Sequence, residues 1–293
     1  MDFWTLLGQS LINGLLLGGV YALIGVGLTL IFGVMGIVNF AHGDLLMLSM
    51  YITYWLGTLF GIDPYVSIPF VACLMIVVGF AIYRFLINPV LDSSHINQAF
   101  TTIGLSIVLQ NLALAIWGAD FRTINLPYSN VVFSVGGIKI VFLRLCAFII
   151  SLAATFILYA FLKKTYVGKA IRATSQNRIA TELMGINTNR IYLLTFGIGA
   201  SLLAIAGAIL IPLLYVYPMV GATFTLTTFV IVIIGGLGSF FGALIGGLII
   251  GLTESINATF FSTSYSVIMV FLVFLIILMF RPRGLFGLRH GWD

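Results

Sequence analysis

The feature that most constrains this chain is a nearly continuous series of apolar stretches, each about as long as a membrane is thick. A helix needs about 20 mostly apolar residues to cross the hydrocarbon core of a bilayer. Only 7% of the 293 residues are charged, whereas a soluble domain carries about a quarter. Nine stretches fit such helices: 8–32, 44–60, 65–87, 99–117, 141–162, 191–214, 217–234, 240–260 and 265–280.

The predicted fold is therefore an all-α, polytopic transmembrane bundle of about 8 to 10 helices. The stretches are too long for the strands of a membrane barrel and lack the alternation of apolar and polar residues that a barrel requires. Cys73 and Cys146 both lie inside apolar stretches, where a free cysteine behaves as a small hydrophobic residue. The first stretch has no basic residue before it and is interpreted as a helix of the mature protein.

The positive charge is concentrated in one connecting segment. Residues 163–190 contain six Lys and Arg residues but only one acidic residue, Glu182, and this difference equals the net charge of +5. Basic loops lie on the cytoplasmic side of membrane proteins. The segment is therefore predicted to be a cytoplasmic loop, and alternation of sides then places the N-terminus outside.

The tail 281–293 carries Arg281, Arg283 and Arg289 and is predicted to be cytoplasmic as well. An even number of crossings must then separate it from the basic loop. Four crossings with a tight turn at 235–239, or two crossings plus a re-entrant hairpin broken there, both satisfy this condition. Four is preferred, which gives nine crossings in a single transmembrane domain, 1–293.

Glycine, present 32 times, recurs at helical spacing. Small residues four apart let membrane helices approach closely. The interpretation is ordinary bundle packing or, alternatively, a surface that moves during transport. The residues assigned to the helix break and its packing are Gly235, Gly236, Gly238, Ser239, Gly242 and Gly246.

The sequence Asn39-Phe40-Ala41-His42-Gly43-Asp44 interrupts two apolar stretches with polar side chains. Non-helical backbone at membrane depth is tolerated where it lines a cavity or is buried in protein. Asn39, His42 and Asp44 are therefore candidates for a translocation pathway; the alternative is a simple turn between helices, with Asp44 near a helix N-terminus. A metal site of His42, Asp44 and His95 is disfavoured. Elsewhere, the lone acid Glu254 is a candidate proton-relay residue if the chain is an ion-coupled transporter.

Within the basic loop, residues 175–185 are predicted to form a short helix that begins at Ser175 or Asn177 and ends at Gly185. Ile179, Leu183 and Met184 form an apolar stripe on it. A helix this short is marginal alone in water. It is expected to dock into a groove of a soluble partner, or to lie on the bilayer surface.

Four segments together resemble the branched-chain amino acid ABC transporter permease family (LivH type, the inner-membrane component of binding-protein-dependent importers). They are GLTLIFGVMGIVNFAHGD (27–44), GKAIRATSQNRIATELMGIN (168–187), GGLGSFFGALIGG (235–247) and RPRGLFG (281–287).

The resemblance implies a bacterial inner-membrane importer with a second related permease subunit, two ATP-binding subunits and an extracytoplasmic substrate-binding protein. The implied substrate is leucine, isoleucine or valine. The family's cytoplasmic E-A-A-x-x-x-G-like pattern is echoed here with a different order of Glu and Ala. The implied ATPase-coupling residues are Arg178, Ile179, Ala180, Glu182, Leu183, Met184 and Gly185.

No phosphate-binding loop of the G-x-x-x-x-G-K-[ST] type is present, and no catalytic signature appears. The chain is therefore predicted not to be an enzyme and to need no cofactor, so ATP must be hydrolysed by other polypeptides. Two alternatives stay open: a permease of the same family for another amino acid or urea, and an ion-coupled secondary transporter.

Overall fold

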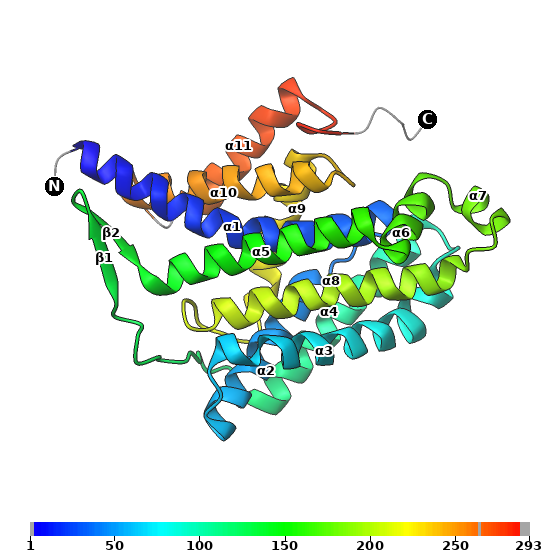
Figure 1. Cartoon of the computed structure of the whole chain (residues 1–293), viewed down its shortest axis with the longest axis horizontal. Helices are drawn as coiled ribbons and strands as arrows, with labels where there is room; N and C mark the ends of the chain where they lie inside the picture. Colours follow the sequence, from blue (N-terminus) through cyan, green and yellow to red (C-terminus); the bar gives the residue numbers. More distant parts are fainter. Residues whose placement is uncertain (1–2, 263–264, 288–293) are drawn as a thin grey trace. The chain divides into compact units, whose positions relative to one another are not determined.

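The structure, a computed structural model, describes residues 3–262 and 265–287 (Figure 1). Each of the nine predicted stretches contains a helix, which confirms the helical membrane fold. Arg289 and the rest of the predicted tail beyond residue 287, like the acidic Asp2, lie outside the described residues. The chain divides into two compact units, and the division falls inside α1, α5 and α9.

Unit 1 comprises residues 1–26, 125–152 and 226–293. Its elements are α1 (Phe3–Met35) as far as Val26, strands β1 (Val132–Val135) and β2 (Ile138–Val141), the first half of α5 (Phe142–Lys164), the second part of α9 (Val220–Gly235), α10 (Phe240–Phe260) and α11 (Ser266–Phe280).

The α1–α10 contact in unit 1 is made through small residues. A methyl group on Gly14 would lie 2.8 Å from Leu252 Cα, and one on Gly18 would lie 2.8 Å from Leu248 Cα. The predicted glycine ladders therefore bring two helix backbones together.

The segment before α5 contains the β1–β2 hairpin, which was not predicted from the sequence. Gly136 and Gly137 form its turn with φ values of +59° and +84°, the left-handed geometry that two-residue hairpins require. The side-chain amide of Gln9 donates to Lys139 O (2.7 Å) and accepts from Lys139 N (2.8 Å), which joins the hairpin to α1.

Unit 2 comprises residues 27–124 and 153–225. Its elements are the end of α1, α2 (His42–Phe60), α3 (Pro64–Ile82), a π-helical turn η1 (Tyr83–Ile87), a 3₁₀ turn η2 (Asn88–Val90), α4 (His95–Trp117), the second half of α5, α6 (Tyr166–Gln176), α7 (Arg178–Leu183), α8 (Thr188–Leu210) and the first turns of α9.

The core of unit 2 is built on α8. Gly79 of α3 lies against this helix, where an added methyl group would be 3.0 Å from Ala200 Cβ and 3.1 Å from Gly197 Cα. From α2, Ser49 Oγ donates to Leu203 O at 3.0 Å. Helix α8 is thus packed by small residues and buried along most of its length.

Polar residues fix several helix starts. Side-chain oxygens of Asp63, Ser94 and Asn187 accept backbone amides in the first turns of α3, α4 and α8, which satisfies donors that a helix leaves unpaired.

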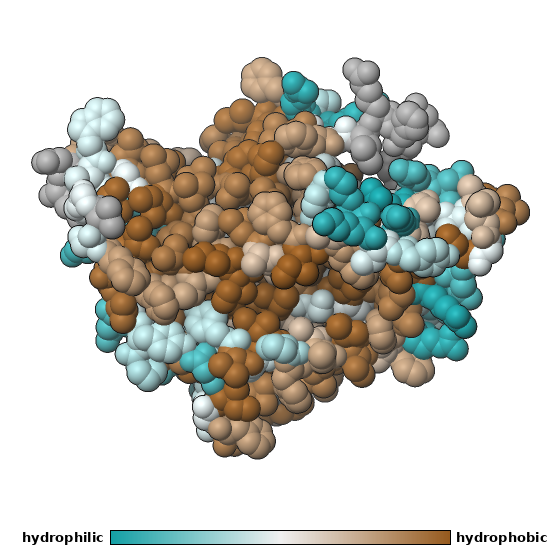
Figure 2. All heavy atoms as spheres, viewed as in Figure 1, coloured by the Kyte–Doolittle hydropathy of each residue, from teal (hydrophilic) through white to brown (hydrophobic). Residues whose placement is uncertain are grey.

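Six helices of the described residues are long and apolar enough to cross a membrane: α1, α3 with its extension to Val90, α4, α5, α8 and α10. Helices α9 and α11 are apolar but shorter, with 16 and 15 residues. The viewed face is largely hydrophobic, with hydrophilic residues gathered mainly near α6 and α7 (Figure 2). The chain is therefore a multi-pass membrane protein.

Candidate functional site

The first candidate site is the elbow (residues 165–187), in which α6 and α7 meet at Asn177. Asn177 has an extended backbone (φ −158°), and its Oδ1 accepts the amide of Ala180 at 2.9 Å. Gly185 follows the end of α7 with φ +80°. Asn177 and Gly185 are thus confirmed as the ends of the short helix, but its predicted start at Ser175 was wrong, because Ser175 belongs to the separate helix α6.

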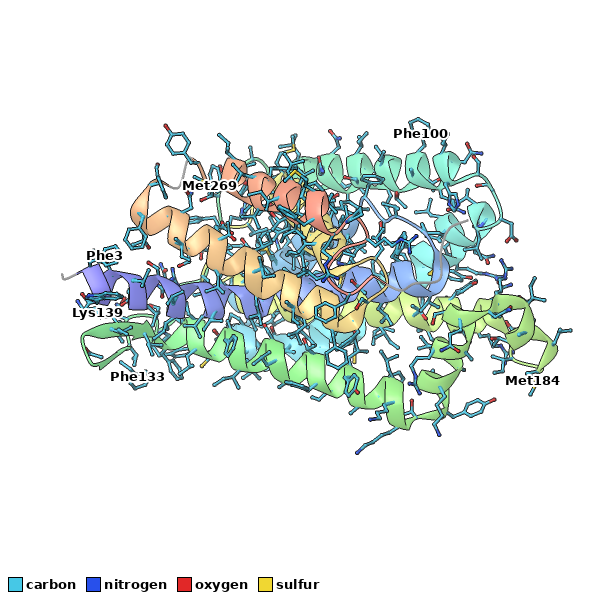
Figure 3. All side chains as sticks on the ribbon, turned by 90° about the horizontal axis from the view of Figure 1, so that it is seen from above. Phe3, Phe100, Phe133, Lys139, Met184 and Met269 are labelled. Atoms are coloured by element: carbon cyan, nitrogen blue, oxygen red, sulfur yellow. The ribbon has the colours of Figure 1, made fainter. Side chains whose placement is uncertain are left out.

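The apolar stripe of the elbow faces solvent. Ile179, Leu183 and Met184 are 71%, 82% and 82% exposed, and Met184 lies at the tip of the elbow in Figure 3. Ala180 is exposed as well. A six-residue helix that, together with the residue after it, exposes three large apolar side chains is typical of a segment completed by another surface.

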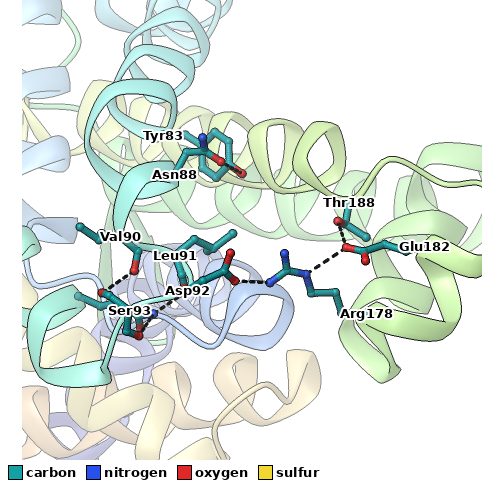
Figure 4. Close-up of polar contacts among 10 residues, drawn as sticks. Tyr83, Asn88, Val90, Leu91, Asp92, Ser93, Arg178, Glu182 and Thr188 are labelled. Atoms are coloured by element: carbon teal, nitrogen blue, oxygen red, sulfur yellow. Dashed lines mark hydrogen bonds and ion pairs between the residues drawn. The ribbon is translucent and has the colours of Figure 1, made fainter.

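A network of charged side chains connects α7 of the elbow to Asp92 and to the start of α8 (Figure 4). The guanidinium of Arg178 donates to Asp92 Oδ1 at 2.7 Å and to Glu182 Oε1 at 3.1 Å, and it lies 5.7 Å from the centre of the Tyr192 ring. Thr188 Oγ1 donates to the same Glu182 oxygen at 2.6 Å.

This network shifts two ionisation equilibria. The hydrogen bond to Asp92 is the main cause that raises the pKa of Arg178 above its ordinary value. The hydrogen bond from Thr188, followed by that from Arg178, lowers the pKa of Glu182. Both side chains are therefore charged at neutral pH.

The second candidate site is the helix junction (residues 36–44 and the first turn of α9). Helix α1 ends at Met35, and Gly36 follows with φ +69°. Asn39 Oδ1 accepts the amide of Ala41 at 3.1 Å, and its Nδ2 is buried without a hydrogen-bond partner in the described part of the chain. Asn39, His42 and Asp44 are all fully buried, so the three predicted pathway residues gather in one buried region.

The carboxylate of Asp44 lies between two helix N-termini. It belongs to the first turn of α2, and a methyl group on Gly221, in the first turn of α9, would lie 2.8 Å from Asp44 N and Cα. The amide of Gly43 donates to Thr225 Oγ1 at 3.0 Å. The glycines at 43 and 221 thus allow the first turns of α2 and α9 to touch.

Two side chains of α4 complete the environment of Asp44. Ser106 Oγ donates to one carboxylate oxygen, and Gln110 Nε2 donates to the other at 3.0 Å. No ion pair to Asp44 occurs among the described residues, so its partners are neutral donors and helix ends. The sequence interpretation missed Ser106 and Gln110, although polar residues four apart in an apolar stretch were a visible signal.

His95, by contrast, is the first residue of α4. The described residues contain no group of three His, Cys, Asp or Glu side chains arranged to hold a metal ion. In unit 1, Glu254 accepts a hydrogen bond from Tyr21 OH at 2.7 Å.

The glycine-rich break separates α9 from α10. Gly236 and Gly238 have φ values of +101° and +81°, and Ser239 Oγ accepts the amide of Gly242 at 3.1 Å to begin α10. Gly235 and Gly242 lie in direct backbone contact, and Gly246 lies against Ile231 O. The break is therefore a tight, closely packed turn.

The C-terminal segment returns to this turn. The amides of Leu285 and Phe286 donate to Ile234 O (2.8 Å) and Gly235 O (3.0 Å), the last carbonyls of α9. Sequence reasoning missed this cap, because nothing local links the RPRGLFG segment to a helix end about 50 residues earlier.

The comparisons with known proteins agree with these features. Residues 10–278 match the family described as the branched-chain amino acid transport system permease component. The chain is 33% identical to the high-affinity branched-chain amino acid transport system permease protein BraD of Pseudomonas aeruginosa and 33% identical to LivH of Escherichia coli strain K12. Each alignment covers 95% of both chains.

A solved structure shares the fold at low sequence identity. It is described as PsaBC from Streptococcus pneumoniae in complex with Fab; the TM-score is 0.50 at 15% identity, over 94% of this chain and 93% of that one.

Proposed function

Because the chain belongs to the family of branched-chain amino acid transport system permease components, we propose that it is the membrane-spanning permease subunit of an importer for leucine, isoleucine or valine. ATP is hydrolysed on two separate ATP-binding subunits. A second related permease completes the membrane core, and an extracytoplasmic binding protein delivers the amino acid. The location is the bacterial inner membrane, with the N-terminus outside and the C-terminus in the cytoplasm.

The exposed apolar stripe of the elbow carries this proposal. Fully burying a side chain such as Leu contributes about 1.5–3 kcal/mol, and Ile179, Leu183 and Met184 are almost entirely available for such burial. The elbow lies in the most basic segment of a chain that lacks a phosphate-binding loop. It therefore has the properties of a docking helix for a separate ATPase.

The helix junction is the proposed part of the translocation pathway. Asn39, His42 and Asp44 lie where one helix stops and two others begin. Transporters often bind or pass solutes at such breaks, because unwound backbone and helix ends offer polar groups. The turn at 235–239 gives structural support, and the whole chain acts as one permease domain.

The docking assignment is tested by placing a charge in the stripe. Leu183→Asp and Ile179→Asp are expected to prevent co-purification of the ATP-binding subunits. Even Leu183→Ala should weaken their binding about ten- to hundredfold, since 1.4 kcal/mol is a factor of ten. Gln176→Asp places the same charge on an exposed position of the elbow outside the stripe and is the matched control.

Unchanged assembly and uptake in Leu183→Asp would contradict the docking assignment. The energy source is tested separately with inhibitors. Uptake should be sensitive to vanadate and insensitive to uncouplers; the reverse pattern would favour the ion-coupled alternative.

A further inference from the structure

One face of α4 carries a stripe of polar side chains at four-residue intervals. These are Gln98, Thr102, Ser106 and Gln110, in a helix whose other faces are mostly apolar. At a rise of 1.5 Å per residue, the stripe extends about 18 Å along the helix. Polar residues are costly within a membrane helix and are retained where they have specific partners.

At the N-terminal end of the stripe, Gln98 is hydrogen-bonded to the loop that contains Asp92. The side-chain amide of Gln98 donates to Leu91 O at 2.7 Å and to Ser93 O at 3.2 Å, the carbonyls on either side of Asp92. Gln98 is buried. Asp92 is therefore fixed to the start of α4, and it is also the residue that receives the 2.7 Å hydrogen bond from Arg178 of the elbow.

Further along, the stripe holds the helix junction. Thr102 Oγ1 accepts the amide of Phe40 at 3.3 Å, and its one proton is shared between Val38 O at 3.1 Å and Ala99 O of its own helix at 3.0 Å, so the hydroxyl contacts the broken segment at two places. One turn later, Ser106 and Gln110 bind both carboxylate oxygens of Asp44. The broken segment and the start of α2 are therefore both attached to α4.

We propose that α4 is the mechanical link between the docking elbow and the helix junction: displacement of the elbow moves Asp92, and α4 carries this movement through Thr102, Ser106 and Gln110 to residues 38–44. Arg178 and Asp92 are positioning residues at one end, and Thr102 is the positioning residue at the other. The inference rests on the proposed function, because it requires that the elbow receives the ATP-driven movement.

Helix α4 is suited to this role because each of its partners is bound at a defined place. An α-helix is rigid over a few turns, and coupling requires only that two arrangements of the junction differ in their contacts with it. The Arg178–Asp92 pair is largely exposed, at 38% and 79% of the two side chains, so its contribution is modest. The contacts of Thr102, whose side chain is fully buried, carry the larger share.

The experiment measures amino acid imported per ATP hydrolysed by the reconstituted complete importer, so that differences in the amount of assembled protein cancel. Thr102→Val should lower this ratio about five- to hundredfold, because the part-buried Val38 carbonyl and Phe40 amide lose a partner. Thr101→Val is the matched control, since among the described residues the Thr101 hydroxyl donates to Asn97 O of its own helix and not to the junction. Thr102→Ser keeps the hydroxyl and should retain the wild-type ratio.

The elbow end is tested with Asp92→Asn, which should lower the ratio by about two- to fivefold, as expected for an exposed ion pair. Asp120→Asn removes the exposed carboxylate of an ion pair outside the elbow, with Arg122 at 3.7 Å, and should leave the ratio unchanged. Asp92 is exposed, so its substitution does not disturb the buried region. If Thr102→Val does not assemble, the ratio measured for Asp92→Asn alone tests the link.

Wild-type ratios in both Thr102→Val and Asp92→Asn would overturn the link. Equal losses in Thr101→Val and Thr102→Val would also overturn it, because they would indicate a general effect on the helix. These results differ from failure of the proposed function, in which Leu183→Asp would leave ATPase assembly intact.

Discussion

Replacement of Gly251 by Ala should destabilise the contact between α1 and α10 in unit 1. The added methyl group would meet the backbone of Gly18 directly and would lie 2.6 Å from Gly14 O. Carbon atoms pack best at about 3.5–4.0 Å, so the helices must separate by about 1 Å. Overpacking of this kind costs about 1–3 kcal/mol.

Gly104→Ala in α4 is the matched control, because a methyl group there meets nothing within 4 Å. Both variants gain the same helix propensity, about 1 kcal/mol, so their difference isolates the interhelical contact. Reversible unfolding in mixed detergent micelles should give a free energy of unfolding about 1–3 kcal/mol lower for Gly251→Ala than for Gly104→Ala. Equal stability of the two variants would refute the close α1–α10 contact.

Three further outcomes follow from single contacts. Tyr21→Phe should destabilise the protein by about 1–3 kcal/mol in the same assay, because it removes the donor to the half-buried Glu254; a change within error would contradict that role. Gly185→Ala should speed amide exchange in α7, because a left-handed backbone costs a non-glycine residue about 1–2 kcal/mol, and Gly185→Asn should be milder. Because the pKa of Glu182 is lowered, its hydrogen bonds with Arg178 and Thr188 are intact at any pH above the ordinary Glu pKa and are lost as the pH falls below that value. The protection of α7 amides from exchange, corrected for intrinsic exchange, should therefore stay level from pH 8 to 5 and decrease below about pH 4. A loss of protection near pH 6 would contradict this.

The helical fold could be predicted from sequence because each apolar stretch is a local property. The stretch predicted at 240–260 coincides with α10, and the one predicted at 99–117 begins four residues late. The late start has a local cause: Ser94 caps a first turn in which three of four residues are polar, and an apolar criterion does not include such a turn. Helix caps, more than hydropathy, set these boundaries.

The elbow was only partly predictable. Its apolar stripe and its ends at Asn177 and Gly185 follow from short-range patterns, whereas α6 was missed because it is amphipathic and has too few apolar residues to resemble a membrane helix. The hairpin at 132–141 was also missed, although its Gly-Gly pair between two β-branched runs is a recognised turn signal. Both omissions came from considering connecting segments mainly by charge.

The helix junction depends on contacts that no local pattern contains. Gly43 and Gly221 are far apart in sequence, and neither identifies the other as its partner. The same holds for Asp44 and its two donors on α4. Sequence reasoning could mark residues 39–44 as unusual, but only the tertiary structure shows what they are bonded to.

The arrangement around Asp44 explains how a carboxylate can remain in a buried site without a basic partner. Each helix N-terminus carries the equivalent of about half a positive charge, and the first turns of both α2 and α9 lie beside this carboxylate. Together with the two hydrogen bonds from α4, these helix ends would stabilise Asp44 in its ionised form. Substitution of Asp44 by Asn would remove the charge but leave the two helix ends and Gln110 in place. The junction is thus held by three helices at once, so any rearrangement of residues 36–44 must move α4 or α9 with it.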